Sequence, residues 1–160
     1  MIQAIIFDLD GTIIDSEPLW QEAEISLFAE EGLFLTGQDC TKTMGLQTYQ
    51  AVKYWHNKIP VKKRSVKELT DALNSKVMNL IREKGKIKPG VKELIEMLHG
   101  QKIKLAIASS STIKLIETVV DKFDLRKYFP VISSGDYVTH GKPNPEIFLL
   151  AASELKVDPM

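Results

Sequence analysis

This sequence has almost no cysteine, no long apolar run and no excess of one charge. Its single cysteine, Cys40, excludes an intrachain disulfide and suits a reducing cytoplasm. The N-terminal apolar run ends at Asp8, too early for a signal peptide or a membrane span. The 21 Lys and Arg residues are balanced by 21 Asp and Glu residues, which gives no support for nucleic-acid or membrane-surface binding. We therefore expect a cytoplasmic protein without either kind of partner.

Two patterns typical of other phosphate and metal sites are absent as well. Neither a GxxxxGK[ST] loop nor a GxGxxG loop occurs. His56, His99 and His140 are isolated, with no cysteine or carboxylate at metal-ligand spacing, so a zinc site is not expected. The densest basic cluster, at residues 62–64, is interpreted as a solvated surface. The sequence thus favours neither P-loop nor zinc chemistry.

The most informative stretch is the beginning of the chain. An apolar run over residues 2–7 predicts a buried strand, and Asp8 and Asp10 follow it. Carboxylates are rarely buried unless they are paired or bind metal. Their placement at the end of a buried strand is therefore unfavourable unless the two residues form a functional site. Residues i and i+2 of a strand point to the same side, so the two side chains can share one site. The alternative interpretation is a strand end followed by an Asp-Gly turn at Gly11.

Strands and helices alternate along the second half of the chain. Buried strands are predicted over residues 103–108 and 131–133, and helical apolar stripes that include Leu94, Ile116 and Phe148 lie around them. Such alternation is typical of parallel βαβ units, so we expect an α/β fold with a doubly wound parallel sheet. Ligands bind at the carboxyl ends of the strands in these sheets.

Residues 16–85 look helical in several pieces and form an insertion after the first strand. The stripe of the first predicted helix, over residues 18–31, consists of Leu19, Ala23, Leu27 and Phe28. A later, longer helix is predicted to start at Ser65, with Glu68 as its capping partner. This helical block is placed where it can close over the sheet edge that carries Asp8.

These residues suit phosphoryl transfer through an aspartyl phosphate. Asp8 would attack phosphorus, while Asp10 would protonate the leaving oxygen and then activate water. Two carboxylates repel a phosphate dianion, so the hard cation Mg²⁺ is the expected cofactor. The residues Ser109–Ser111 would form an anion site at a helix N-terminus, with an ordinary N-cap as the alternative. Lys142, in a turn between prolines, is a candidate phosphate clamp, with a plain surface lysine as the alternative.

The same residues resemble the motifs of the haloacid dehalogenase superfamily. Residues 8–12 (Asp-Leu-Asp-Gly-Thr) match its first motif, Ser109 its second, and Lys142 with the following proline its third. The resemblance implies a Rossmann-like core, residues 1–15 and 86–160, and a small helical cap, residues 16–85. It also implies Asp8 as nucleophile, Asp10 as general acid and base, and Mg²⁺ held by the Asp8 carboxylate and the Asp10 carbonyl.

The resemblance extends to a set of substrate contacts. The residues expected to contact the substrate are Asp8, Leu9, Asp10, Glu17, Trp20, Gly45, Leu46, Ser109, Ser110 and Lys142. Trp55 is a further candidate at the cap entrance, although packing in the cap interior is an equal alternative for it and for Trp20. For Glu17 the alternative is a first-turn acid that favours the helix dipole.

At residues 15–20, 44–46 and 88–91 the chain looks like the β-phosphoglucomutase-like branch of the superfamily. Residues 52–60 and 107–111 are similar to the corresponding stretches of bacterial 2-deoxyglucose-6-phosphate (hexitol) phosphatases. This similarity implies Mg²⁺-dependent hydrolysis of small phosphate esters, above all hexose or deoxyhexose 6-phosphates. Mutases of this branch have a histidine where Trp20 stands and an arginine where Gln47 stands. Their absence favours hydrolysis, with a mutase-like phosphoryl transferase as the alternative.

The family's fourth motif, an acidic pair, should follow Asp158 closely, but the sequence stops at Met160. We therefore expect the parent protein to be ~50–65 residues longer, by two βα units, and a monomer when full length. A third Mg²⁺ carboxylate is expected beyond Met160, and the sheet is expected to be incomplete, with an open edge at the first strand. The 160 residues alone would then be weakly active, inactive, or only a binding module.

Overall fold

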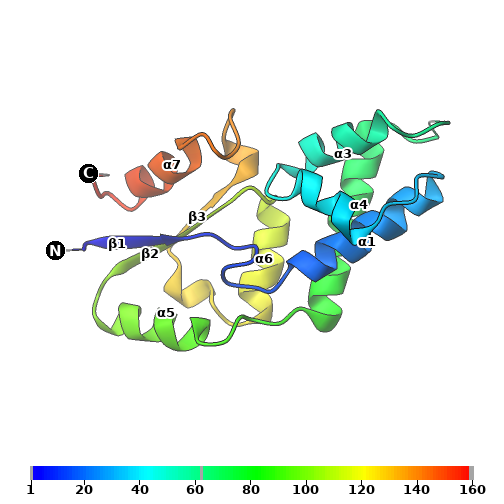
Figure 1. Ribbon diagram of the computed structural model, residues 1–160. Coiled ribbons are helices and arrows are strands. Elements are labelled where there is room, and N and C mark those ends of the chain that lie inside the picture. The colour runs from blue at the N-terminus through cyan, green and yellow to red at the C-terminus, as the bar shows by residue number, and fades with distance from the viewer. Residues whose placement is uncertain (1, 62, 159–160) are drawn as a thin grey trace.

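Three parallel strands form the sheet in the part of the chain that the structure describes. The structure, a computed structural model, describes residues 2–61 and 63–158. Strands β1 (Ala4–Phe7), β2 (Lys104–Ser109) and β3 (Val131–Ser134) lie in the order β1-β2-β3 (Figure 1). Phe7 is opposite Ile107, and Ser109 is opposite Ser134. This register brings the carboxyl ends of all three strands to one edge of the sheet.

Helices cover both faces of the sheet. On one side β2 directs the small residues Ala106 and Ala108 toward α7 (Glu146–Glu154), where they pack with Ala151. On the other side Leu105 and Ile107 join a larger cluster that includes residues of α5 (Val91–Gly100) and α6 (Ile113–Lys122). Figure 1 shows α7 on the opposite side of the strands from α5 and α6. Burial on both faces explains why the strands are apolar throughout rather than alternating.

Among the described residues, the inserted block contains four α-helices. They are α1 (Glu17–Glu30), α2 (Gly37–Cys40), α3 (Thr48–His56) and α4 (Val66–Lys84). The predicted α1 stripe is confirmed, because all four of its apolar residues are buried. The predicted start of α4 is also confirmed: the Ser65 hydroxyl accepts from the Glu68 N–H at 3.2 Å, and the Glu68 carboxylate accepts from the Ser65 N–H at 2.8 Å. This reciprocal pair satisfies two otherwise free donors.

Three 3₁₀ turns complete the described elements: η1 (Thr41–Thr43), η2 (Arg126–Tyr128) and η3 (Gly135–Tyr137). Within residues 2–61 and 63–158, none of the helices combines the length and the apolar character needed to cross a membrane.

The inserted helices and the sheet share one interior. A single cluster of buried apolar side chains runs from Phe7 and Leu9 through Leu27 and Leu73 to Ile107. Helix α4 contacts α1 and α3 on one side and α6 on the other, so it joins the two parts. The division into core and cap at residues 16–85 stays a prediction.

In the described part of the chain, β1 forms one edge of the sheet, as predicted, because only β2 pairs with it. Phe7 is nevertheless buried, with its ring packed edge-on against Phe129 at a centroid distance of 5.8 Å.

Pro159 and Met160, beyond which the further carboxylate is predicted, lie outside the described residues. Two predicted stripe residues are exposed instead of buried: Leu94 at 41% and Phe148 at 37%.

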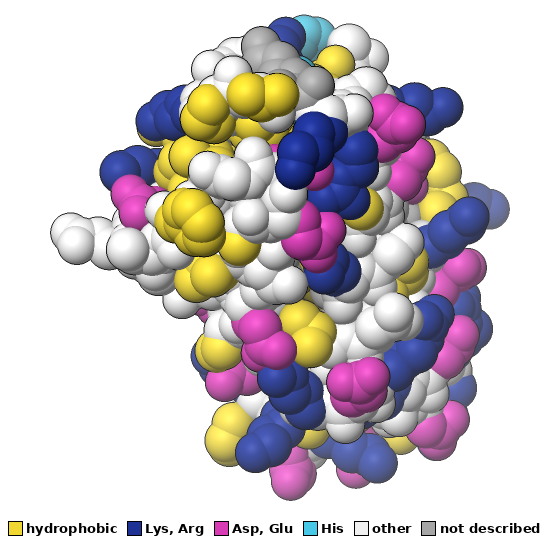
Figure 2. Space-filling model, turned by 90° about the vertical axis from the view of Figure 1, so that its right-hand side faces the viewer, with side chains coloured by type: hydrophobic (Ala, Val, Ile, Leu, Met, Phe, Trp, Pro, Cys, Tyr) yellow, Lys and Arg dark blue, Asp and Glu magenta, His cyan; other side chains and the backbone are white. Residues whose placement is uncertain are grey.

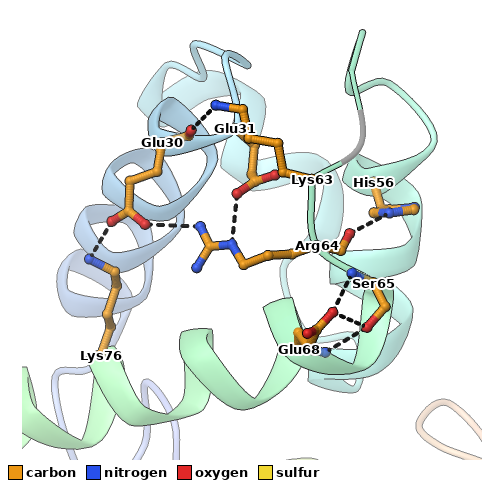
Figure 3. Close-up of polar contacts among 8 residues, drawn as sticks. All are labelled: Glu30, Glu31, His56, Lys63, Arg64, Ser65, Glu68 and Lys76. Carbon is orange, nitrogen blue, oxygen red and sulfur yellow. Dashed lines mark hydrogen bonds and ion pairs between the residues drawn. The ribbon is translucent and has the colours of Figure 1, made fainter.

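The basic cluster is not simply a solvated surface, contrary to the prediction. Arg64 donates from Nε to Glu31 at 2.7 Å and from Nη2 to Glu30 at 2.9 Å, and Lys76 also pairs with Glu30 at 2.9 Å (Figure 3). These contacts join the C-terminal end of α1 to α4 and to the loop before it. Lys62, the first residue of the cluster, lies outside the described residues. Figure 2 shows acidic and basic side chains interleaved over much of the face it views, which agrees with the balanced charge.

Candidate active site

The carboxyl end of β1 places Asp8 beside Lys142. Oδ1 of Asp8 accepts from the Lys142 ammonium at 2.9 Å and from the Leu9 N–H at 2.8 Å. The lysine also donates to the main-chain oxygen of Ala108 at 3.1 Å, and it lies 4.9 Å from the ring centroid of Phe148. The ammonium group is therefore held between the ends of β1 and β2, where it forms an ion pair with the Asp8 carboxylate.

Asp10 accepts hydrogen bonds at both carboxylate oxygens. Oδ1 accepts from the Ser16 hydroxyl at 2.7 Å and from the Trp20 indole N–H at 3.0 Å. Oδ2 accepts from the Ser111 hydroxyl at 2.8 Å and from the Ser109 hydroxyl at 3.3 Å. Two of the donors come from the start of α1 and two from the end of β2, so this single side chain links the inserted helices to the sheet.

A tight turn after β1 sets the direction of the two aspartates. Gly11 has a φ of +72°, a left-handed conformation that disfavours other residues, and its N–H donates to the Ile14 carbonyl at 2.9 Å. The Ile13 N–H donates back to the Leu9 carbonyl at 2.8 Å. The Leu9 side chain is fully buried in the apolar interior. Leu9 was expected to contact substrate, but its side chain points into the core and its N–H is bonded to Asp8.

The serine-rich turn after β2 is fixed by the loop after β3. The Ser134 hydroxyl donates to the Ser111 carbonyl at 2.7 Å, and the Gly135 N–H donates to the same oxygen at 3.3 Å. A Cβ atom at Gly135 would lie 2.4 Å from the Ser110 carbonyl oxygen, so only glycine allows this approach. The N-cap interpretation of the serines is wrong: Thr112 occupies the N-cap, and the Ile113 N–H is bonded instead to the Asp136 carboxylate at 2.8 Å.

A cavity of about 340 Å³ opens from the two aspartates into the inserted helices. Nine of the ten residues expected to contact substrate line it, and Leu9 is the exception. The lining residues that the sequence did not single out as substrate contacts are Gly11, Gln21, Glu24, Cys40, Thr43, Met44, Thr48, Ala51 and Ser111. The cavity thus has a charged end at the strands and a mixed polar and apolar wall beneath the helices.

Trp55 does not line this cavity. It is 2% exposed, packs with Phe28 at a ring-centroid distance of 6.5 Å, and donates its indole N–H to the Thr43 hydroxyl at 3.2 Å. Packing in the cap interior is therefore correct for Trp55, whereas Trp20 lies at the cavity and contacts Asp10. Thr43 itself faces the cavity, so Trp55 supports the wall from behind.

The family follows from comparison with known proteins. The sequence pattern of the haloacid dehalogenase-like hydrolase family matches residues 5–160. The chain belongs to this family. Hexitol phosphatase B of Escherichia coli (strain K12) is 33% identical over 160 residues, which cover 99% of this chain and 72% of that protein. The phosphorylated carbohydrates phosphatase of Thermotoga maritima is 32% identical over 158 residues, which cover 99% and 73%.

A solved structure in the same fold agrees. The crystal structure of CbbY from Rhodobacter sphaeroides in complex with phosphate superimposes with a TM-score of 0.90 at 28% identity, covering 99% of this chain and 75% of that one. The α/β fold and the resemblance to the haloacid dehalogenase superfamily are thereby confirmed. The chain is a phosphatase of this family, that is, a phosphoric monoester hydrolase.

The haloacid dehalogenase-like site offers oxygen donors suited to Mg²⁺. Mg²⁺ is usually bound by one or two carboxylates, water and substrate phosphate rather than by a complete protein cage. The Asp8 side chain is 41% exposed, and its contacts with described residues both fall on Oδ1. Within the described residues there is no group of three or more His, Cys, Asp or Glu side chains that could hold a metal. The donors present therefore fit Mg²⁺ held partly by substrate and water.

Glu24 is the most unusual group in the cavity wall. It is 6% exposed, and its Oε2 atom has no hydrogen-bond partner among the described residues. Burial raises the pKa of Glu24 to about 7, opposed by an interaction with the Cys40 thiol and reinforced by the charge of Glu17. Burial and the nearby Glu24 carboxyl group also raise the pKa of Cys40 to about 12. The thiol is therefore a neutral, unreactive part of the wall.

Proposed function

We propose that this chain hydrolyses phosphate monoesters of small sugars or sugar alcohols, hexose or deoxyhexose 6-phosphates in particular, with Mg²⁺ and through a phosphorylated Asp8. The observation that carries the proposal is the placement of Asp8, with the Lys142 ammonium at 2.9 Å, beside Asp10 at the mouth of the cavity. A carboxylate nucleophile and a fixed cation at one strand end are what phosphoryl transfer requires.

The two aspartates divide the reaction between them. Asp8 attacks phosphorus, and the bond from phosphorus to the ester oxygen breaks as Asp10 gives its proton to that oxygen. Asp10 then takes a proton from water, whose oxygen attacks phosphorus and releases phosphate and a free Asp8 carboxylate. Lys142 balances negative charge on Asp8 and on the transferring group, and the Ser109 and Ser110 groups at the cavity are placed to contact the phosphate.

Mg²⁺ would be held by the Asp8 carboxylate and the Asp10 main-chain oxygen, with water and substrate phosphate completing its shell, and it would neutralise phosphate charge. Without such a cation, Asp8 and Asp10 would repel a phosphate dianion. Lys142 alone supplies one positive charge against the two carboxylates, so metal dependence is expected.

The cavity supports a small substrate. Its volume of about 340 Å³ is at the lower end of ligand pockets, which span about 300–1,000 Å³. We propose that residues 16–85 act as a cap that selects the alcohol part, because α1 and the segment from Cys40 to Ala51 provide most of the wall beyond the aspartates. The names of the relatives from Escherichia coli and Thermotoga maritima, a hexitol phosphatase and a phosphorylated carbohydrates phosphatase, support a carbohydrate substrate.

The test is phosphate release from 2-deoxyglucose 6-phosphate, with and without Mg²⁺. We expect metal-dependent release that Asp8→Asn abolishes and that Asp121→Asn, an exposed change on α6, leaves intact. Undiminished release by Asp8→Asn would show that the nucleophile is assigned wrongly. Release that EDTA does not affect would overturn the metal requirement. Isomerised sugar phosphate that appears only with added bisphosphate would indicate mutase chemistry.

A further inference from the structure

Glu24 is a buried acid in the wall of the cavity. Only 6% of the residue is exposed, so it is more than nine-tenths buried. Its Oε2 atom has no hydrogen-bond partner in the described part of the chain. Leaving such a group unsatisfied in a low-dielectric interior lowers the stability of the folded protein. A cost of this kind, at a cavity wall, is expected where a ligand completes the hydrogen bonds.

No cation in the described residues offsets this acid. The ion pairs of α1 are made elsewhere: Glu22 pairs with Lys84 at 2.6 Å on the surface, and Glu30 and Glu31 pair with Arg64 at the far end of the helix. The neighbours of Glu24 are instead the Cys40 thiol and the like-charged Glu17. Because Glu24 also lines the cavity, a ligand bound there can supply the missing partner.

The place of Glu24 along α1 gives the length that a ligand must have. Glu17, Gln21 and Glu24 are spaced by four and three residues, so they follow one helix face, and all three line the cavity. Asp10 is bonded to Ser16 and Trp20 at the start of this helix. At 1.5 Å per residue, Glu24 lies about 10 Å beyond Glu17 along the helix axis. A ligand that reaches from the aspartates to Glu24 must therefore have several carbon atoms beyond its phosphate.

We propose that Glu24 accepts or donates a hydrogen bond to a hydroxyl group at the end of the substrate remote from the phosphate, and so selects phosphate esters of multi-carbon polyols and sugars. This inference rests on the proposed phosphatase function and names the substrate class of the same cavity. A hydroxyl fits better than an ammonium group, because a carboxyl group with a pKa raised to about 7 is not a fixed anion at neutral pH. A hydroxyl can pair with either protonation state of Glu24.

The experiment compares two six-carbon esters that differ only in hydroxyl groups: sorbitol 6-phosphate and hexyl phosphate. Their dissociation constants are measured by calorimetry on the Asp8→Asn chain, which cannot turn them over. We expect Glu24→Leu to raise the dissociation constant of sorbitol 6-phosphate by about tenfold or more. The dissociation constant of hexyl phosphate should stay unchanged or fall. Glu24→Gln keeps a donor and an acceptor and should cost less than about threefold. The matched control is Glu22→Leu on the exposed side of the same helix.

Equal loss for both esters, or no loss for either, would overturn the role of Glu24 in selecting hydroxyl groups. Retained binding of hexyl phosphate shows that the Leu variant is folded. A second readout uses the chain with Asp8 intact. There the kcat/KM for sorbitol 6-phosphate, divided by that for hexyl phosphate, should fall in Glu24→Leu. Failure of the proposed function appears differently, as no phosphate release from either ester, and the binding comparison still decides the role of Glu24.

Discussion

The indole N–H of Trp20 donates to Oδ1 of Asp10 at 3.0 Å, across the boundary between helix α1 and the turn that follows strand β1. Ser16 shares the same oxygen at 2.7 Å, while the serines after β2 hold the other oxygen. Asp10, the proposed general acid and base, is thus oriented from both sides, and in this proposal Trp20 acts on the chemistry through Asp10.

Replacing Trp20 by Phe should lower kcat without unfolding the chain. The ring still packs, but Asp10 loses one of four donors, so we expect kcat to fall about fivefold to tenfold. Trp20→His supplies a ring N–H and should recover part of the loss. Steady-state phosphate release on one substrate measures both variants. A Trp20→Phe enzyme with unchanged kcat and raised KM would show that the ring binds substrate and does not position Asp10.

Removing the charge of Lys142 should affect catalysis far more than stability. In Lys142→Met the Asp8 carboxylate loses its ion pair at 2.9 Å, and the transferring phosphate loses a fixed cation. We expect kcat/KM to fall by about 100-fold or more, the size typical for loss of one preorganised electrostatic contact. The control is Lys127→Met, which removes an exposed lysine on η2 and should leave kcat/KM unchanged. A loss below threefold in Lys142→Met would contradict the clamp.

The stability of the chain should depend on pH through Glu24. Its pKa is raised from 4.5 to about 7 in the folded state by burial, with the Glu17 carboxylate adding to the effect and the Cys40 thiol opposing it. Below pH 4.5 both folded and unfolded chains carry the proton, so there is no cost. As the pH rises toward 7 the unfolded chain releases it first, and the free energy of unfolding falls by up to about 3 kcal/mol.

Urea unfolding at a series of pH values between 4.5 and 8 measures this dependence. Glu24→Gln should flatten the part of the curve that Glu24 causes and raise stability at pH 8, whereas Glu22→Gln should leave the slope in place. A slope that survives unchanged in Glu24→Gln would assign it to other groups.

The strand ends and part of the cavity wall were predictable from the sequence, but Glu24 was not. Asp8, Asp10, Ser109 and Lys142 follow apolar runs whose parallel arrangement brings them to one edge, and the structure brings them together there. Glu24 has no such signal, because it follows Ala23 of the apolar stripe and looks like an ordinary polar residue of an amphipathic helix. Glu24 is buried because the segment around Cys40 packs beside it. That packing depends on tertiary structure, which the local sequence pattern of α1 does not show.

The ion pairs beyond the cavity give the last prediction, on the pair formed by Arg64 and Glu31 (Figure 3). The Glu31 side chain is 2% exposed, and its Oε2 atom already has no partner in the described residues. Arg64→Met removes the partner of Oε1 as well and leaves a buried charge uncompensated, so the free energy of unfolding should fall by about 3 kcal/mol. Urea midpoints at constant m-value measure the loss.

Two further variants separate this pair from a general effect of losing an arginine. Arg126→Met removes an arginine whose partners Glu117 and Asp121 are exposed, and it should cost less than about 1 kcal/mol. Adding Glu31→Gln to Arg64→Met removes the stranded charge, so the double variant should be more stable than Arg64→Met alone. A double variant that is less stable by the full sum of the single losses would show that Arg64 stabilises the cap by packing its side chain and not by neutralising Glu31.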